Sequence, residues 1–153
     1  MSKVHEGSEV RACSRDEASE LREALYHLGY PRELGGRLEK ALSGAGLRSF
    51  AAGETVMRRG ESAHEAYVVR LGSVDVASEH AGRPRVLARI GEGGIVGEIG
   101  VLRATPRSAT VAASEDCELF VLDRETFARV LSSSPEFRRR VEEIAEERRP
   151  RPR

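Results

Sequence analysis

The chain has 153 residues, and its 25 basic and 25 acidic side chains cancel to a formal net charge of zero at pH 7. This length favours one domain, or one domain with a small helical addition. Without net positive charge, the chain lacks the overall electrostatic signature of a nucleic-acid-binding protein. Arginines do gather after Arg138, but glutamates offset all but the last few, which is typical of a solvated end.

The cysteine pattern and hydropathy indicate a cytoplasmic protein. Cys13 and Cys117 fit no metal-binding spacing, so we expect reduced thiols. No stretch approaches the ~18 consecutive apolar residues of a membrane-spanning helix, and the polar N-terminus is not a signal peptide. We therefore expect no direct membrane insertion. In a membrane system, the chain would be a part on the cytosolic face.

The first 46 residues predict a tail followed by two helices. Residues 1–13 show no periodicity, and we expect a disordered tail. The order Ser14, Arg15, Asp16, Glu17 has the form of a capping box and starts a helix to about Leu28. A second helix follows Pro31, giving a helical hairpin over residues 14–46. The hairpin either covers the core or moves with the element that follows it.

From Leu47 the apolar residues alternate in short runs, with glycine-containing turns every 7 to 12 residues or so. Tyr67, Val69 and Leu71 place apolar groups on one face of such a strand. We expect an antiparallel β-roll or jelly roll over residues 47–123.

Helical character returns after Asp123, which can cap a helix containing Phe127 and Val130. The order Ser134, Pro135, Glu136 is a strong start signal for another helix. In it Phe137, Val141 and Ile144 form an apolar stripe, and Arg148 falls on nearly the same face. The expected fold class is therefore mainly β with flanking helices (α+β), with C-terminal helices over residues 124–149.

No catalytic or metal motif is found. The four histidines are scattered, and no Ser, Cys or Lys lies in a nucleophile motif. Residues 91–97 are glycine-rich, but the third glycine is one residue late for a dinucleotide loop and the segment lies among strands. We expect no enzymatic activity, no metal and no cofactor.

The segment 97–111 carries the chemistry. A buried Arg107 can clamp a phosphate through parallel charge-assisted hydrogen bonds, and Glu98 can accept from a sugar hydroxyl. Their spacing suits a small nucleotide. Taken singly, Arg107 could be an edge-strand arginine covering apolar surface, and Glu98 an ordinary turn residue.

The order Gly97, Glu98, Ile99, Gly100, followed by Pro106, Arg107, Ser108, Ala109, resembles the phosphate-binding cassette of cyclic nucleotide-binding domains. The resemblance extends over about residues 45–149 and includes the glycine turns and the Ser134 helix start. The C-terminal portion is similar to the cytosolic domain of bacterial cyclic-nucleotide-regulated potassium channels. Two positions depart from the family pattern: Val96 replaces an aromatic residue, and Gly100 replaces alanine and should loosen its turn by up to about 1 kcal/mol.

The resemblance implies roles for individual residues. Arg107 would hold the cyclic phosphate, the amides of Gly97 and Ala109 would lie against ribose and phosphate oxygens, and Glu98 would accept from the ribose 2′-hydroxyl. In the family, Thr at the position of Ser108 is associated with cGMP and Ala with cAMP, whereas Ser can serve either. The final helix would close over the base as a lid, with Arg148 contacting it. The expected ligand-binding set is Gly97, Glu98, Ile99, Arg107, Ser108, Ala109 and Arg148.

The resemblance thus implies a sensor of cAMP, or of cGMP, whose lid closure regulates an attached or partner effector such as an ion channel. One alternative is the sensor of a transcription regulator, which would need a DNA-binding module after the lid, whereas this chain ends at Arg153. The other is a degenerate scaffold that acts only through protein contacts. No nucleic-acid partner is expected.

Overall fold

The computed structural model describes residues 6–148, without the side chains of residues 79, 80 and 84. Its strands are β1 (Arg11–Ala12), β2 (Gly46–Phe50), β3 (Thr55–Met57), β4 (Glu65–Leu71), β5 (Val74–His80), β6 (Arg83–Ile90), β7 (Ile95–Val96), β8 (Thr110–Ala113) and β9 (Cys117–Asp123). Its helices are α1 (Arg15–His27), the 3-10 turn η1 (Arg32–Leu34), α2 (Gly35–Ala41), α3 (Glu98–Arg103), α4 (Arg124–Ser133) and α5 (Pro135–Glu147). The predicted first five residues of the tail and residue 149 of the last helix lie outside the described residues.

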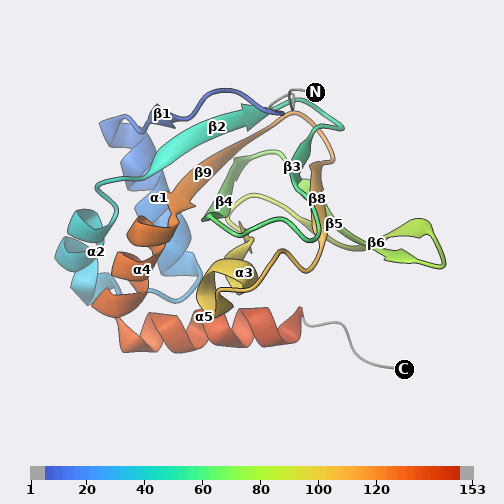
Figure 1. Cartoon of the computed structure of the whole chain (residues 1–153). Helices are drawn as coiled ribbons and strands as arrows, with labels where there is room; N and C mark the ends of the chain where they lie inside the picture. Colours follow the sequence, from blue (N-terminus) through green and yellow to red (C-terminus); the bar gives the residue numbers. More distant parts are fainter. Residues whose placement is uncertain (1–5, 149–153) are drawn as a thin grey trace.

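The strands form two antiparallel sheets. The first has the order β1-β2-β9-β4-β7, and the second has the order β3-β8-β5-β6. In Figure 1 the helices α1, α2, α4 and α5 gather beside the first sheet, whereas the β5–β6 hairpin projects from the opposite side. This arrangement confirms the predicted β fold with flanking helices.

The first sheet is the middle of three layers, so its central strands are buried on both faces. On β4, Ala66 and Val68 pack with the helices, while Tyr67 and Val69 pack toward the second sheet. The sequence predicted Tyr67, Val69 and Leu71 on one face of this strand. Tyr67 and Val69 do share a face, whereas Leu71 lies beyond a register shift and is 45% exposed. The opposite face is apolar too, because a strand covered by helices on one side and by a sheet on the other needs apolar residues at successive positions.

The prediction that residues 1–13 form a disordered tail is wrong for residues 6–13, the part that the structure describes. Arg11 and Ala12 pair antiparallel with β2. Closer to the N-terminus, the amide of Ser8 donates to the carbonyl of Ser49 at 2.7 Å. A carboxylate oxygen of Glu6 accepts from the amide of Thr55 at 2.9 Å. Backbone pairing with a sheet edge requires no side-chain periodicity, so the sequence pattern could not indicate it.

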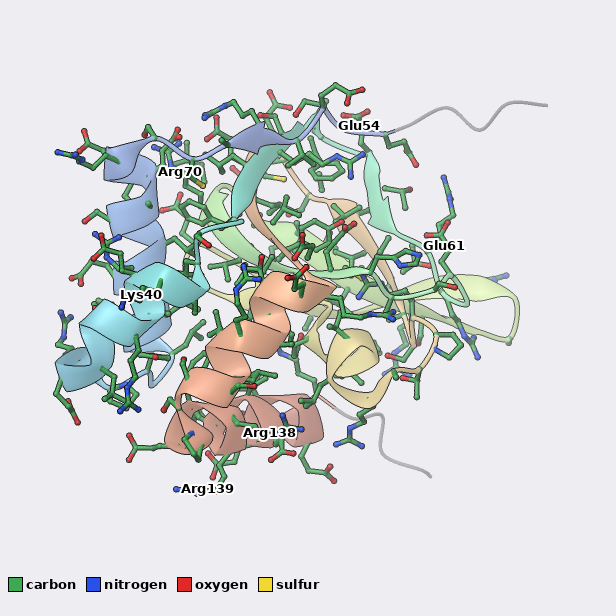
Figure 2. All side chains as sticks on the ribbon, turned by 60° about the vertical axis from the view of Figure 1, so that its left-hand side comes forward. Lys40, Glu54, Glu61, Arg70, Arg138 and Arg139 are labelled. Atoms are coloured by element: carbon green, nitrogen blue, oxygen red, sulfur yellow. The ribbon has the colours of Figure 1, made fainter. Side chains whose placement is uncertain are left out.

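The predicted helix starts are confirmed. Ser14 and Glu17 make both hydrogen bonds of a capping box, Asp123 caps α4, and Ser134 caps α5 with Pro135 at its first position. Helix α5 buries one face and exposes the other, and Figure 2 shows Arg138 and Arg139 pointing outward from it.

The N-terminal hairpin packs on the last two helices through Tyr30. The fully buried Tyr30 ring lies 5.3 Å from that of Phe137 on α5, centroid to centroid, and its hydroxyl is 2.7 Å from Oγ of Ser133 on α4. The hairpin therefore contacts α4 and α5 directly, as well as the first sheet. Both predicted roles of the hairpin, a cover for the core and an element that moves with its neighbours, agree with this contact.

Candidate functional site

A cavity between the β5–β6 hairpin, helix α3 and the end of α5 is lined by every predicted site residue. Its lining includes Gly97, Glu98, Ile99, Arg107, Ser108, Ala109 and Arg148. The first three lie where β7 turns into α3, the next three lie in the loop before β8, and Arg148 follows the last turn of α5. The fold thus brings residues from separate segments to one site. Figure 1 shows α3 next to α5.

Gly97 makes the sharp turn from β7 into α3. It has a left-handed φ of 79°, which glycine adopts without the steric cost that a side chain adds. A Cβ at this position would lie 2.8 Å from Cε of Met57 and 2.9 Å from Nη1 of Arg107. Both the backbone and the close approach of Arg107 therefore require glycine.

Arg107 is a buried cation held by backbone carbonyls. Its residue is 6% exposed, and its guanidinium donates to the carbonyl of Gly97 at 2.8 Å and to that of Glu65 at 2.7 Å. Its own backbone is fixed in both directions to the β3–β4 turn, by hydrogen bonds with Glu61 and Gly60. These contacts hold the guanidinium in one place at the wall of the cavity.

The charge of Arg107 is not balanced by a close carboxylate. Among residues 6–148, apart from the undescribed side chains of residues 79, 80 and 84, no carboxylate lies within ion-pair distance of its guanidinium. Burial lowers the pKa of Arg107, although the more distant Tyr67 and Glu65 act in the opposite direction. Arginine nevertheless stays protonated. The site thus contains a buried cation that an anion would complement.

Glu98 is the acidic group of the cavity. Its side chain is 2% exposed, and its Oε1 accepts from Nη1 of Arg148 at 3.0 Å. Burial raises the pKa of Glu98, while the positive charges of Arg148 and Arg107 oppose that rise. The same Nη1 of Arg148 also donates to the carbonyl of Ile95 on β7. In this structure Arg148 therefore reaches into the cavity and holds Glu98.

The remaining predicted residues lie on the open side of the cavity. Ser108 is exposed and Ala109 is half-buried, immediately before β8. Ile99 is half-buried on the first turn of α3. They therefore form a rim next to the buried Arg107.

An apolar wall completes the cavity, and the sequence did not indicate it. Its members are Met57, Val76, Leu87, Val96 and Val111. Leu87 is an extra residue on β6, since Val76 pairs with Ala88 whereas its neighbour Ala77 pairs with Val86. Such a bulge re-aims a side chain, and it leaves Leu87 45% exposed beside the cavity. The adjacent apolar pair at 86 and 87, which breaks the alternation of β6, is the only local sign of it.

The described part of the chain gives little support for a metal site, a membrane-spanning helix or a reactive thiol. Among the side chains that the structure describes, no group of three or more His, Cys, Asp or Glu could hold a metal ion. No described helix has the length and apolar character needed to cross a membrane. Burial raises the pKa of the Cys117 thiol to about 11, which keeps it in its unreactive protonated form.

The chain belongs to the cyclic nucleotide-binding domain family, whose sequence model matches residues 47–134, more than half of the chain. The catabolite activator protein of Thermus thermophilus is similar in structure, with 29% identity and a TM-score of 0.69 over 82% of this chain and 57% of that one. A cyclic nucleotide-binding domain from Methylobacillus flagellatus KT has the same fold at 18% identity and a TM-score of 0.71, over 92% of this chain and 80% of that one.

The regulatory domain of Toxoplasma gondii PKA, crystallised with cAMP, also has this fold. It is 24% identical, with a TM-score of 0.67 over 77% of this chain and 46% of that one. This chain thus spans about half the length of that regulatory domain.

Proposed function

We propose that this chain is a sensor domain that binds cAMP in the cavity around Arg107. The observation that carries the proposal is the buried guanidinium of Arg107, which faces the cavity without a carboxylate partner among the described residues. A cyclic phosphate carries one negative charge and two unbridged oxygens, and a guanidinium can bind such a pair of acceptors through parallel hydrogen bonds.

The other walls suit the rest of the nucleotide. The amides of Gly97 and Ala109 border the phosphate and ribose side, and Glu98 is the acceptor for the ribose 2′-hydroxyl. Ile99 and Ser108 line the same side. The exposed Leu87 and the neighbouring Val76 offer apolar surface on which a purine would be buried. Support for cAMP comes from the related regulatory domain crystallised with it, whereas Ser108 leaves cGMP as the second ligand to test.

The output would pass through the helices that border the site. Helix α5 carries Arg148 at its end, and it contacts the N-terminal hairpin through Phe137 and Tyr30. A ligand that changes the position of α5 would therefore also act on the hairpin. The effector would be an attached or partner protein, such as an ion channel. The 29% identity to a catabolite activator protein supports a transcription regulator as the other kind of effector.

Calorimetric titration with cAMP and cGMP tests the proposal. Replacing Arg107 with alanine should weaken cAMP binding at least about tenfold, since loss of a buried charge pair costs about 2–5 kcal/mol. Arg103→Ala is the matched control, because this exposed arginine ends α3, whose first residues line the cavity, but does not line the cavity itself. Thermal unfolding of each variant checks that it is folded.

Two results would count against the proposal. Equal cAMP affinity of the wild type and of folded Arg107→Ala would remove Arg107 from the site. Absence of binding of either nucleotide to the folded wild type would favour the scaffold alternative.

A further inference from the structure

Arg107 lines a second cavity as well as the nucleotide cavity. This second cavity lies between β2 and β4 of the first sheet and β3 of the second, and Glu6, Arg58 and Tyr67 also form its wall. Its volume is about 620 Å³. Because open space rather than packed side chains lies beyond Arg107 on this side, hydrogen bonds have the larger share in fixing its position.

The backbone of Arg107 is held by the β3–β4 turn. Its carbonyl accepts from the amide of Gly60 at 2.9 Å, and its amide donates to the carbonyl of Glu61 at 2.8 Å. A third bond joins the same two segments, from the amide of Arg59 to Oγ1 of Thr110 at 3.1 Å. The turn is itself mostly exposed. Its own position therefore depends on contacts with other segments.

Glu6 anchors this turn to the N-terminal segment. One of its carboxylate oxygens accepts from the amide of Thr55 on β3 at 2.9 Å, and the other accepts from Nη2 of Arg58 at 2.7 Å. A hydrogen bond to a charged acceptor is roughly twice as strong as a neutral one. The side chains of Glu6 and Arg58 are 29% and 52% exposed, so the ion pair contributes less to this anchor than the bond to the amide.

The segment of residues 6–12, which we call the N-terminal strap, is bound along β2. Arg48 on β2 donates through Nε to the carbonyl of Ser8 at 2.8 Å and through Nη2 to that of Glu6 at 3.0 Å. The other end of the strap pairs with β2 as strand β1. The strap thus connects the edge of the first sheet to the turn that holds Arg107.

Gly7 brings the strap against the sheet. It has a left-handed φ of 85°, and a Cβ built on it would lie 2.6 Å from the ring of Phe50. Its amide donates to a carboxylate oxygen of Glu54 at 3.2 Å, and Figure 2 shows Glu54 beside the N-terminal segment. A side chain at this position would meet both a strained backbone and the Phe50 ring, and it would lift the strap.

We infer that Glu6 is a positioning residue of the nucleotide site. Through Arg58 and the β3–β4 turn, Glu6 keeps Arg107 in the place where it binds the cyclic phosphate, so release of the strap weakens binding. This inference rests on the proposed function and concerns the regulation of that same site. Because coupling between two sites is reciprocal, bound nucleotide also stabilises the strap. A partner that lifts the strap would thereby lower the affinity for the nucleotide.

Calorimetry of Glu6→Ala tests this role. The variant removes both contacts of the carboxylate, and we expect cAMP affinity to fall about three- to tenfold, because the turn that holds Arg107 loses a charge-assisted bond. Glu6→Gln keeps an acceptor for the amide of Thr55 and should restore part of the affinity. Glu9→Ala changes an exposed residue of the same strap and should bind as the wild type does. Equal affinities of Glu6→Ala and Glu9→Ala would contradict the inference.

Gly7→Ala provides a second variant that leaves the Glu6 carboxylate in place. It should lift the strap from Phe50 and weaken cAMP binding by about the same factor as Glu6→Ala, and the two changes together should add little to either one. Gly53→Ala is the control, because its φ of 87° imposes a similar backbone cost and no atom lies within 4 Å of the added Cβ. Wild-type affinity in folded Gly7→Ala would count against the strap.

A double variant separates positioning from a general loss of stability. If Glu6 acts through Arg107, the effect of Glu6→Ala on cAMP affinity should largely disappear in a chain that already carries Arg107→Ala. A role limited to folding would instead lower the affinity by the same factor with or without Arg107. That second result would overturn the positioning role.

Hydrogen exchange provides a readout in the wild-type chain. Saturating cAMP should slow exchange at the amides of Gly7, Ser8 and Thr55, whose hydrogen bonds hold the strap. The two proposals fail in different ways. Binding that depends on Arg107 but is unchanged in Glu6→Ala and Gly7→Ala, with unchanged exchange in the strap, overturns the positioning role and retains the sensor. Absence of cAMP and cGMP binding to the folded wild type overturns both.

Discussion

Gly100 on helix α3 packs directly against Ala63 in the loop before β4: a Cβ built on Gly100 would lie 2.6 Å from Cβ of Ala63. The sequence suggested that glycine at this position loosens the short helix. The structure gives it a steric role instead, since α3 can lie close to the β3–β4 connection only without a side chain. The family's usual alanine is thus incompatible with this neighbour unless one of them moves.

Gly100→Ala should therefore lower the free energy of unfolding by about 1–3 kcal/mol, the usual cost of overpacking. Helix propensity alone predicts the opposite sign, a gain of about 1 kcal/mol. Urea unfolding measures the difference. Adding Ala63→Gly to this variant should recover part of the loss. If Gly100→Ala alone were more stable than the wild type, the contact with Ala63 would not require glycine at position 100.

Gly97→Ala should disrupt the site more than the fold. The left-handed φ of 79° costs a side chain about 1–2 kcal/mol, and the new Cβ would also displace the guanidinium of Arg107. We expect a loss of cAMP affinity comparable to that of Arg107→Ala, measured by calorimetry. Gly53→Ala is the control, because it has a similar φ of 87° with no atom within 4 Å of the added Cβ. Equal affinities in the two alanine variants would contradict this explanation.

Glu98 should make stability depend on pH. Burial raises its folded pKa above the ordinary 4.5, so between these two values the folded state binds more protons than the unfolded state. Stability then falls as pH rises from about 4.5 through the folded pKa, and it recovers on acidification. Thermal unfolding across that range should show the dependence enlarged in Arg148→Ala, because the charge that opposes the raised pKa is gone. In Glu98→Gln this contribution should disappear, and an unchanged profile there would assign the dependence to other groups.

Tyr30→Phe should weaken the joint between the hairpin and the last helices. It removes the hydroxyl that lies 2.7 Å from Oγ of Ser133, at an expected cost of about 0.5–1.5 kcal/mol. The cost should stay in this range because Ser133 still donates to the carbonyl of Val130. Tyr26→Phe changes a half-buried tyrosine nearby and should have little effect. Urea unfolding of both variants checks the comparison.

Elements with local signals could be predicted from the sequence. The capping residues Ser14, Asp123 and Ser134 each contact an amide three residues ahead, so their effect depends only on neighbours in the chain. Alternating apolar residues indicated the β-roll for a similar reason, since the pleat repeats every two residues. The spacing of Glu98 and Arg107 identified the candidate site because both belong to one continuous segment.

Contacts between distant segments could not be predicted in this way. The pairing of Arg11 with Leu47 follows from an open sheet edge that exists only after folding. Leu87 reaches the cavity through a bulge defined by its partner strand, and Glu65 supplies Arg107 with a carbonyl from 42 residues away. Register and close approach depend on how whole layers pack, which no local pattern encodes.

Taken by itself, the sequence determined the succession of N-terminal helices, β-roll and C-terminal helices, the capped helix starts, and the presence of a cassette that contains Glu98 and Arg107. Those features depend on backbone hydrogen bonds and side-chain periods within a few residues. The tertiary structure alone decided that Arg107 is buried without a carboxylate partner among the described residues, that Gly100 is required by Ala63, and that Arg148 reaches Glu98. Whether a charge is buried, and which partner it meets, depends on how α5, α3 and the two sheets pack together.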